Sequence, residues 1–481
     1  GIQLSADLLT LKRKRHEERE TAELQKLQLY SLAHLPTEWR GKRYRRTGGL
    51  ATETARADGE KAERLKKGRE VAGLLLEAQL PFASSLGPRA LEGDTPLRCC
   101  RGLRAKTLAQ RVACWRPFRR WLLARDLPPW PAAASQVLEY LEVVGREGAA
   151  RTTQSSLLSS LRFLEEAGEV PEAERLSLSP AVKNAVREGP GQAEEKDTRK
   201  KAGAGQAPPL LLAIIVALED LVSDDTAKPY HRGYAWFKLL RHWTSMRWDD
   251  TQGLKPASLE RRARGLYGQL ERTKTSGPGK HRGVLPVFVS ADAWLKRPWL
   301  DAGLALWLDP DQGLGFKRDY FLPLPDAEFA GALKMRALYS DALGFTRALL
   351  ATLSTDAGWA LTPHPANLFW SEHSDRAGLD GWLASLGVGK PERDFLGRWS
   401  TSSTDSYVRT ACRVVENLQR LAADYGRKAL SGGPDFFGEE EVLLQLREHL
   451  LDKGVNEVYA AKILEALTVS DAALVPVSLI N

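Results

Sequence analysis

Two side chains that suit an anionic substrate stand three residues apart in the last quarter of the sequence. His373 and Arg376 are separated by Ser-Asp. On a helix, residues at i and i+3 lie on one face, so the imidazole and the guanidinium can point at one anion. Some thirty residues later comes Tyr407, flanked by small polar residues. Anion-binding groups followed by a hydroxyl nucleophile predict phosphoryl transfer through a phosphotyrosine.

This arrangement resembles the catalytic half of the tyrosine recombinases, the phage integrase family. Upstream, Arg247 is followed three residues later by Asp250 and then by Gly253-Leu254, which resembles the family's first-arginine motif. The order Arg, His-x-x-Arg, Tyr is therefore the order that this family uses. The resemblance spans some 160 residues, from Arg247 to Tyr407.

A predicted β-hairpin lies between these motifs. Residues 270–280, followed by 284–289, are typical of a strand, a Gly/Pro turn and a second strand. The resemblance implies a catalytic lysine on such a hairpin, and Lys274 is our candidate. Arg272 and Lys280 flank the turn and remain the fallback candidates.

The segment before Tyr407 allows two alignments. Leu396-Gly397 resembles the family's Leu-Gly pair, which precedes a His or Trp. Arg398 then occupies the His/Trp position, nine residues before Tyr407, whereas Trp399 occupies it if one residue has been lost. Because Trp is an accepted residue there, we assign the role to Trp399 and expect Arg398 to contact a phosphate.

The resemblance assigns a role to each catalytic candidate. Arg247 and Arg376 would hold the phosphate, because a guanidinium can bind two oxygens in a planar fork. Tyr407 would attack phosphorus, His373 would assist as base and then acid, and Lys274 would protonate the departing 5′ oxygen. We expect no cofactor and no metal, since the sequence has no P-loop and no acidic cluster typical of a two-metal site.

Composition indicates an ordinary globular protein with a polyanionic partner. The 481 residues allow two or three domains, and the net charge of +8 with a pI near 9.2 is consistent with DNA binding. The four cysteines show no disulfide or zinc spacing, no apolar run reaches membrane length, and no signal peptide is recognised. We therefore expect a nuclear or otherwise intracellular protein that is not secreted. A start at Gly1 is compatible with a piece of a longer polypeptide.

We expect a mainly α fold with a small β-sheet (α+β). Amphipathic patterns predict helices near 107–122, 135–144, 155–166 and 180–187, and the Trp-, Asp- and Pro-rich segment 294–324 is predicted to be a long loop. By resemblance, the helical part is a core-binding domain and the following part a mixed α/β catalytic domain. The expected organisation is a charged extension over 1–97, the core-binding domain over 98–188, a basic flexible linker over 189–207, the catalytic domain over 208–430 and a helical tail over 431–481.

The expected partner is double-stranded DNA, and the family habit implies a homotetramer on DNA and an origin in a mobile element. Basic residues outside the catalytic set are expected to contact the DNA backbone, namely Lys106, Arg151, Arg199, Lys200, Lys201 and Lys280, together with Arg398.

Three alternatives remain open. A catalytically degenerate DNA-binding descendant would keep the fold, and Ala377, at a position where the family usually has His, favours that reading. A type IB topoisomerase would share the chemistry, although the two-domain layout around the linker favours a recombinase. A helical protein-interaction module predicts no DNA affinity and no convergence of the five catalytic candidates in space.

Overall fold

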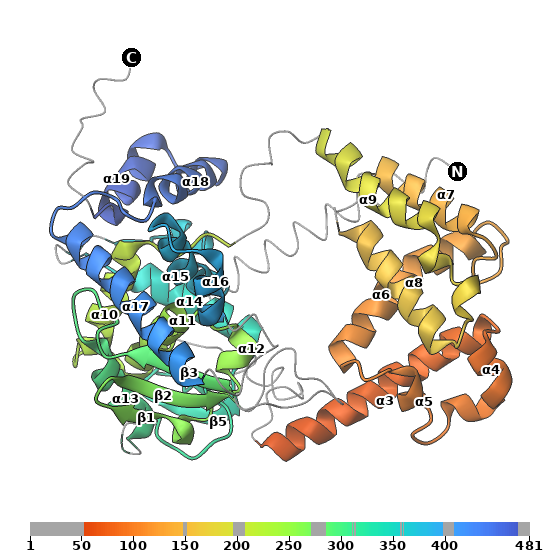
Figure 1. The fold of residues 1–481 in the computed structure, drawn as a ribbon, viewed down its shortest axis with the longest axis horizontal. Coiled ribbons are helices and arrows are strands. Elements are labelled where there is room, and N and C mark those ends of the chain that lie inside the picture. The colour runs from red at the N-terminus through yellow and green to blue at the C-terminus, as the bar shows by residue number, and fades with distance from the viewer. Residues whose placement is uncertain are drawn as a thin grey trace. The chain divides into compact units, whose positions relative to one another are not determined.

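The structure is a computed structural model that describes residues 52–147, 152–195, 207–270, 285–309, 311, 314–355, 358, 360–397 and 408–469. The described chain is mainly α with two small antiparallel sheets, which confirms the predicted fold class. Two compact units contain these residues, one within Thr54–Ala204 and the other within Gly205–Ser276 and His281–Asn481. Figure 1 labels the elements of both units.

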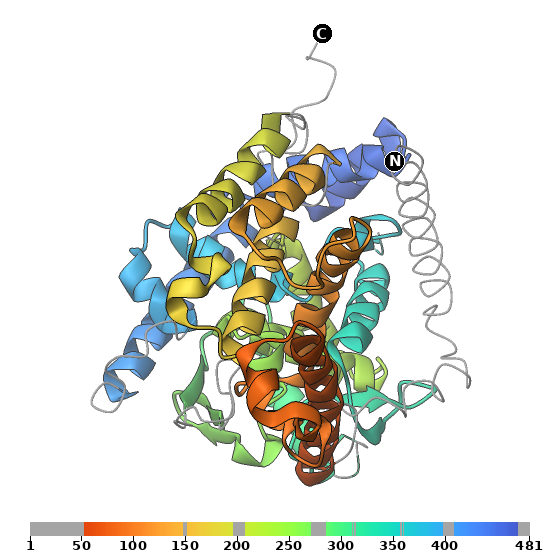
Figure 2. The ribbon, with the colours of Figure 1, turned by 90° about the vertical axis from the view of Figure 1, so that its right-hand side faces the viewer.

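The first unit is entirely helical in its described residues. Figures 1 and 2 show its helices, of which α6 packs against α8 and α7 against α9. Trp115, Phe118 and Leu161 are fully buried in its core. Its elements are α3 (Glu53–Glu77), α4 (Pro81–Leu86), η2 (Gly87–Leu91), α5 (Pro96–Cys99), α6 (Ala105–Leu123), α7 (Ala134–Arg146), α8 (Thr153–Ala167), η3 (Glu172–Glu174), η4 (Leu176–Leu178) and α9 (Pro180–Glu195).

Two features of this unit differ from the sequence expectation. Helix α9 continues to Glu195, into the segment predicted as a linker, because the residues before its end, Gln-Ala-Glu-Glu, favour helix over coil. Helix α3 lies within the expected charged extension, yet Val71 and Leu75 belong to the same core as α6 and α8. The four predicted helices are confirmed as α6 to α9.

The second unit holds both sheets and the candidate catalytic residues. Its elements are α10 (Leu212–Ser223), α11 (Pro229–Thr244), α12 (Trp248–Thr251), η6 (Pro256–Ser258), β1 (Glu260–Arg262), β2 (Gly265–Leu270), β3 (Leu285–Ser290), α13 (Trp299–Leu308), β4 (Pro323–Pro325), β5 (Ala332–Arg336), α14 (Tyr339–Thr352), η8 (Ala366–Leu368), α15 (Ser374–Ser385), α16 (Lys390–Gly397), α17 (Val408–Leu430), α18 (Glu439–Asp452) and α19 (Glu457–Leu467).

Helix α11 is the centre of this unit. It is aromatic or aliphatic around most of its circumference, as expected for a helix buried on all sides, and Tyr234, Trp236 and Trp243 are at most 2% exposed. Helices α10, α13 and α15 pack against it. Contact with α13 is close, since a Cβ added at Gly303 would lie 1.8 Å from a Trp236 ring carbon. Helix α11 is therefore a rigid support for the elements around it.

The predicted strand pair is present as β2 and β3, which pair antiparallel from Gly265↔Ser290 to Leu270↔Leu285, although the first strand begins at Gly265, earlier than the expected Leu270. Strand β1 extends the sheet in the order β1-β2-β3, and β4 and β5 form the second sheet. Helices α11 and α17 both pack against β3. Residues 271–284, between β2 and β3, lie outside the described residues, and with them Arg272, Lys274 and Lys280.

The expectation of a long loop over 294–324 is wrong. Helix α13 occupies the middle of this segment, and Trp299 and Trp307 are almost fully buried in the main core. Tryptophan and proline suggested a loop, but Trp-Leu-Asp-Ala-Gly-Leu-Ala-Leu-Trp-Leu carries enough apolar surface to bury as a helix against α11. Helix α17 closes the region expected to be the catalytic domain, and the expected helical tail contains α18 and α19.

Candidate active site

Arg247 stands at a sharp turn between two helices. Helix α11 ends at Thr244, its C-cap residue Ser245 has a left-handed φ of 48° and ψ of 30°, and the chain then turns into the short helix α12. Arg247 is the N-cap residue of α12, and its carbonyl accepts hydrogen bonds from the backbone N–H of Thr251 at 2.9 Å and from the Thr251 hydroxyl at 3.0 Å. Its guanidinium is one third exposed and lies 3.8 Å from the Asp250 carboxylate.

His373 and Arg376 occupy the first turn of α15. His373 is at the N-cap position, and its carbonyl accepts the backbone N–H of Arg376 at 3.1 Å and that of Ala377 at 3.2 Å. The Ser371 hydroxyl accepts the N–H of His373 at 3.2 Å, and the Ser374 hydroxyl accepts the N–H of Ser371 at 3.0 Å. The predicted i, i+3 relationship is confirmed, with His373 exposed and Arg376 partly exposed beside a helix N-terminus that favours anions.

The positive charge of Arg247 acts on Arg376. Burial lowers the pKa of Arg376, and the positive charge of Arg247 lowers it further, while Asp250 opposes both effects. Asp250 therefore interacts with both guanidinium groups. It forms an ion pair with Arg247 at 3.8 Å, and its negative charge raises the pKa of Arg376. Arg247 thus acts electrostatically on a residue from a distant segment of the sequence.

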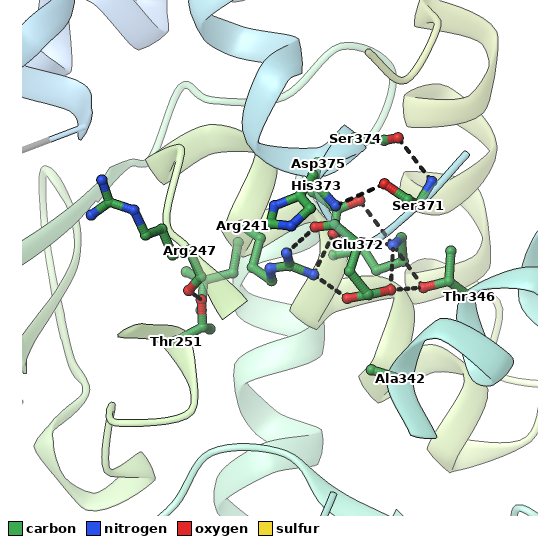
Figure 3. Close-up of polar contacts among 12 residues, drawn as sticks. Arg241, Arg247, Thr251, Ala342, Thr346, Ser371, Glu372, His373, Ser374 and Asp375 are labelled. Atoms are coloured by element: carbon green, nitrogen blue, oxygen red, sulfur yellow. Dashed lines mark hydrogen bonds and ion pairs between the residues drawn. The ribbon is translucent and has the colours of Figure 1, made fainter. Parts of the chain in front are cut away.

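Beneath His373 lies a buried cluster of four charged side chains, which we call the ion cluster: Lys238, Arg241, Glu372 and Asp375. All four are at most 1% exposed. The Lys238 ammonium lies 2.8 Å from the Asp375 carboxylate, and the Arg241 guanidinium lies 2.7 Å from it. Arg241 also donates to the carboxylate and the carbonyl of Glu372. Figure 3 shows Arg241 directed at both acids and the Arg247 side chain directed away from them.

Two hydroxyls complete this cluster. The Lys238 ammonium donates to the Thr346 hydroxyl at 2.9 Å, and Thr346 in turn donates to the Glu372 carboxylate. The Tyr234 hydroxyl lies 2.7 Å from Thr346 and 2.9 Å from the carbonyl of Ala342. Burial alone would raise the pKa of Glu372, but the charges of Lys238 and Arg241 outweigh burial and lower it to about 2. The cluster is thus two cations and two anions, with equal and opposite charge.

The ion cluster fixes which way α15 faces. Asp375 and Arg376 are neighbours on α15, and neighbouring residues on a helix differ in direction by about 100°. When Asp375 points at α11, Arg376 points elsewhere, and Glu372 holds the residue before the N-cap His373 to Arg241. Sequence reasoning missed this cluster, although a Lys and an Arg at i and i+3 in an otherwise aromatic helix were a signal for it.

A second contact sets the distance between α15 and α11. Gly378 on α15 faces His242 on α11, and a Cβ added at Gly378 would lie 2.4 Å from the His242 Nδ1 atom. The His242 ring is fully buried and packs 4.6 Å from the Trp382 ring, and burial lowers its pKa to about 3. Neither ring nitrogen has a hydrogen-bond partner among the described residues. Only glycine permits this approach.

Helix α17 begins at Val408, directly after Tyr407, and a buried amide holds it in place. The Gln419 side chain accepts the backbone N–H of Ser290 at 2.7 Å and donates to the carbonyls of Trp243 at 2.6 Å and Phe288 at 3.1 Å. One side chain on α17 thus binds both β3 and the end of α11. The end of α11 leads directly into Arg247. The hydrogen bonds of Gln419 therefore connect the start of the chain segment that carries Arg247 with the helix that follows Tyr407.

Several predicted site residues lie outside the described residues: Lys274, Trp399, Tyr407, Arg398, Arg151, Arg199, Lys200, Lys201 and Lys280. Lys106 is described and is exposed in the first turn of α6. Of the six catalytic candidates, the structure describes Arg247, His373 and Arg376. His373 and Arg376 share the first turn of α15, and Arg247 lies close enough to Arg376 to lower its pKa. The remaining roles stay predictions.

The described part of the chain has no group of three or more His, Cys, Asp or Glu side chains that could hold a metal ion. None of its helices is both long and apolar enough to cross a membrane.

Solved structures of DNA recombinases show similarity to this chain. The integrase from mycobacterium phage Brujita has 14% identity and a TM-score of 0.25, over 71% of this chain and 94% of the integrase. The XerH site-specific recombinase bound to difH substrate in a pre-cleavage complex has 12% identity and a TM-score of 0.29, over 75% and 95%. Its post-cleavage complex with palindromic difH has 13% identity and a TM-score of 0.31, over 74% and 96%.

No family model matches the sequence, and no curated protein matches it. The functional assignment therefore rests on the residues of the site. Two guanidinium groups and an imidazole beside a helix N-terminus can bind a phosphate and stabilise the charge that develops when it is attacked.

Proposed function

We propose that this chain is a site-specific DNA recombinase or integrase that cuts and rejoins DNA through a 3′-phosphotyrosyl intermediate at Tyr407. One observation carries the proposal: Arg247, from a distant segment, lies close enough to Arg376 for its positive charge to lower the pKa of Arg376, and Arg376 shares a helix turn with His373. Holding two like charges together costs free energy in the absence of a ligand, and a bound phosphate would repay it. The ion cluster supports this, because it keeps the acids of the same helix turn away from that face.

The proposed reaction is an exchange of phosphodiester bonds. The Tyr407 oxygen forms a bond to phosphorus, its proton passes to His373, and the bond from phosphorus to the 5′ oxygen breaks. Lys274 supplies the proton that the 5′ oxygen takes up, while Arg247 and Arg376 hold the non-bridging oxygens. Attack by a 5′ hydroxyl of a partner strand reverses these steps and releases Tyr407. Bonds made equal bonds broken, so no oxidant, reductant or cofactor is consumed.

The remaining assignments belong to the same proposal. Trp399 would line the site that binds the phosphate, and Arg398 would contact the phosphate itself. Lys106, Arg151, Arg199, Lys200, Lys201 and Lys280 would contact the backbone of double-stranded DNA. A homotetramer on DNA, a nuclear location and an origin in a mobile element are expected from the family resemblance and stay predictions.

A suicide substrate tests the proposal directly. The full chain is incubated with nicked duplexes drawn from the flanks of its encoding locus, and the products are resolved in SDS. We expect an SDS-resistant protein–DNA adduct that Tyr407→Phe abolishes, because phenylalanine has no oxygen to attack phosphorus. An adduct that still forms in the Tyr407→Phe variant would contradict the assignment of Tyr407 as the nucleophile.

A second candidate function is DNA binding without cleavage, and one observation favours it. Ala377 lies beside Arg376 in the first turn of α15, where the family usually has His. This candidate predicts salt-sensitive DNA binding with no adduct and no effect of Tyr407→Phe. A helical protein-interaction module predicts no DNA affinity at all, so one binding titration separates the third alternative from the other two.

A further inference from the structure

A tyrosine that the sequence motifs do not include lies against the candidate site. Tyr339 is the first residue of α14, and its ring centroid is 5.9 Å from that of His373, with the planes 41° apart. The Trp248 ring centroid lies 6.2 Å from that of Tyr339, with the planes 83° apart. Trp248 directly follows Arg247 in the sequence. Tyr339 therefore joins the α12 side of the site to the α15 side.

The backbone around Tyr339 is firmly held. Its neighbour Leu338 is the N-cap residue of α14, and the Asp341 carboxylate accepts the N–H of Leu338 at 2.9 Å. Asp341 is almost fully buried, and the next turn of α14 carries Thr346, which bonds to the ion cluster. The starting point of the Tyr339 side chain is thus fixed relative to His373.

The Tyr339 ring is not an ordinary core residue. It is 37% exposed, whereas the other tyrosines that pack on this support, Tyr230 and Tyr234, are at most 2% exposed. Both of those hydroxyls bond to backbone carbonyls in the interior. A large ring left partly in solvent beside an exposed imidazole is available to a ligand.

On the basis of the proposed function, we infer that Tyr339 is a positioning residue for His373 and that its hydroxyl donates a hydrogen bond to the bound DNA phosphate. The ring restricts the His373 imidazole from one side, while the helix turn restricts it from below. The hydroxyl, carried on the same ring, adds a neutral donor to the two guanidinium groups of Arg247 and Arg376.

The surroundings of Tyr339 suit a donor and oppose a nucleophile. Burial raises the pKa of its hydroxyl, and the nearby negative charge of Glu372 raises it further, with Arg241 and Arg347 acting in the other direction and Asp375 in the same one. The phenol therefore keeps its proton at neutral pH. Tyr339 does not compete with Tyr407 for attack on phosphorus, since the attacking oxygen must lose its proton.

Two substitutions separate the ring from the hydroxyl. Tyr339→Phe keeps the ring and removes the donor, and Tyr339→Leu removes both. Tyr425→Phe is the matched control, because Tyr425 is also partly exposed but packs on Phe436 along α17. The first measurement uses no DNA cleavage: imidazole signals are followed by NMR against pH, with and without inorganic phosphate, and His373 is assigned by loss of its signal in His373→Gln.

We expect Tyr339→Leu to shift the His373 titration and Tyr339→Phe to leave it unchanged. Tyr339→Phe should weaken the phosphate-induced change about 3- to 10-fold, the loss expected for one neutral hydrogen bond. Tyr425→Phe should change neither. A His373 titration that is the same in Tyr339→Leu and the unsubstituted chain would overturn the positioning role, and phosphate affinity unchanged in Tyr339→Phe would overturn the donor role.

Cleavage of the nicked duplex then separates this inference from the proposed function. If the unsubstituted chain forms the Tyr407-dependent adduct, Tyr339→Phe should form it about 3- to 10-fold more slowly. If the unsubstituted chain forms no adduct, the proposed function fails, and the NMR result still decides whether Tyr339 orients His373 and binds phosphate. An adduct lost in Tyr339→Phe but kept in Tyr407→Phe would make Tyr339 the nucleophile and overturn both assignments.

Discussion

The ammonium of Lys238 on α11 lies 2.8 Å from the carboxylate of Asp375 on α15, and both side chains are fully buried. Charges buried in this way are stable only when each has its partner. The pair therefore ties the rotation of α15 to α11, and with it the direction of the adjacent Arg376. A structural ion pair thereby sets the geometry of a residue that we assign to phosphate binding.

Removing one member of this pair should be costly. Asp375→Ala leaves the Lys238 and Arg241 charges with only Glu372, and we expect a loss of about 3–5 kcal/mol in the free energy of unfolding. Denaturant unfolding followed by tryptophan fluorescence measures it. Asp394→Ala is the control, because Asp394 pairs with the exposed Lys390 one turn away on α16, where we expect about 0–1 kcal/mol. Equal losses in the two variants would contradict a buried, coupled cluster.

Two glycines on α15 offer a sharper comparison. Gly378→Ala places a methyl group 2.4 Å from the His242 ring, so α15 must move away from α11. Gly381→Ala, on the same helix, meets nothing within 4 Å. We expect Gly378→Ala to destabilise by about 1–3 kcal/mol through overpacking and to slow adduct formation. Gly381→Ala should stabilise by about 0.5–1 kcal/mol through helix propensity. Thermal unfolding of both variants checks the opposite signs, and a destabilised Gly381→Ala would contradict the expectation.

The sequence predicted the parts of this site that depend on local spacing. The i, i+3 relationship of His373 and Arg376 follows from helical periodicity, and the β2–β3 hairpin follows from two β-rich runs around a turn. The ion cluster could not be derived in this way, because Lys238 and Asp375 are far apart in sequence and only the packing of α11 on α15 brings them together. Charged residues are expected at the surface unless their partners are known.

Tyr339 and α13 show the same limit in other forms. Tyr339 stands in no recognisable motif, and only the folded chain places it against His373. The proline and tryptophan residues of 294–324 led us to predict a loop. The structure instead contains helix α13, which buries its apolar face against α11. Tertiary burial overrode the local pattern there, as it does wherever an apolar segment has a partner surface.

Acidic pH should lower the free energy of unfolding, because His242 between α11 and α15 is buried in its neutral form. Its folded-state pKa is about 3, while the unfolded chain takes up a proton near the ordinary value of 6.5. Between these values only the unfolded state is protonated, so stability is lost as pH falls from about 6.5 towards 3, by up to about 1.4 kcal/mol per pH unit. Urea unfolding at pH 7, 6 and 5 measures the slope.

His242→Leu is the variant that tests this origin. The substitution replaces the titrating imidazole by an apolar side chain of similar size. The dependence of the free energy of unfolding on pH below 6.5 should therefore become shallower. Some slope should remain from His231, whose pKa burial lowers to about 4. Comparing slopes rather than absolute stabilities removes any packing cost of the substitution. An unchanged slope would mean that His242 does not titrate in this range.

Substitution of Arg376 should slow adduct formation strongly while changing the free energy of unfolding little. Burial and the charge of Arg247 lower its pKa, so the folded protein holds this charge against an electrostatic cost. Arg376→Gln removes the cost, and we expect the free energy of unfolding to change by no more than about 1 kcal/mol. Loss of one preorganised donor to the phosphate should slow adduct formation about 10²- to 10³-fold.

Arg232→Gln supplies the opposite case. Arg232 lies towards the other end of α11, where it donates to the carbonyl of Val222 at 3.1 Å and pairs with Asp225 at 2.6 Å, and its side chain is 11% exposed. We expect this variant to lose about 1–3 kcal/mol of stability and, once folded, to form the adduct at the unsubstituted rate. Unfolding and adduct kinetics on both variants give a crossed pattern if Arg376 binds phosphate. A purely structural Arg376 would instead lose stability as Arg232→Gln does, with adduct formation following the folded fraction.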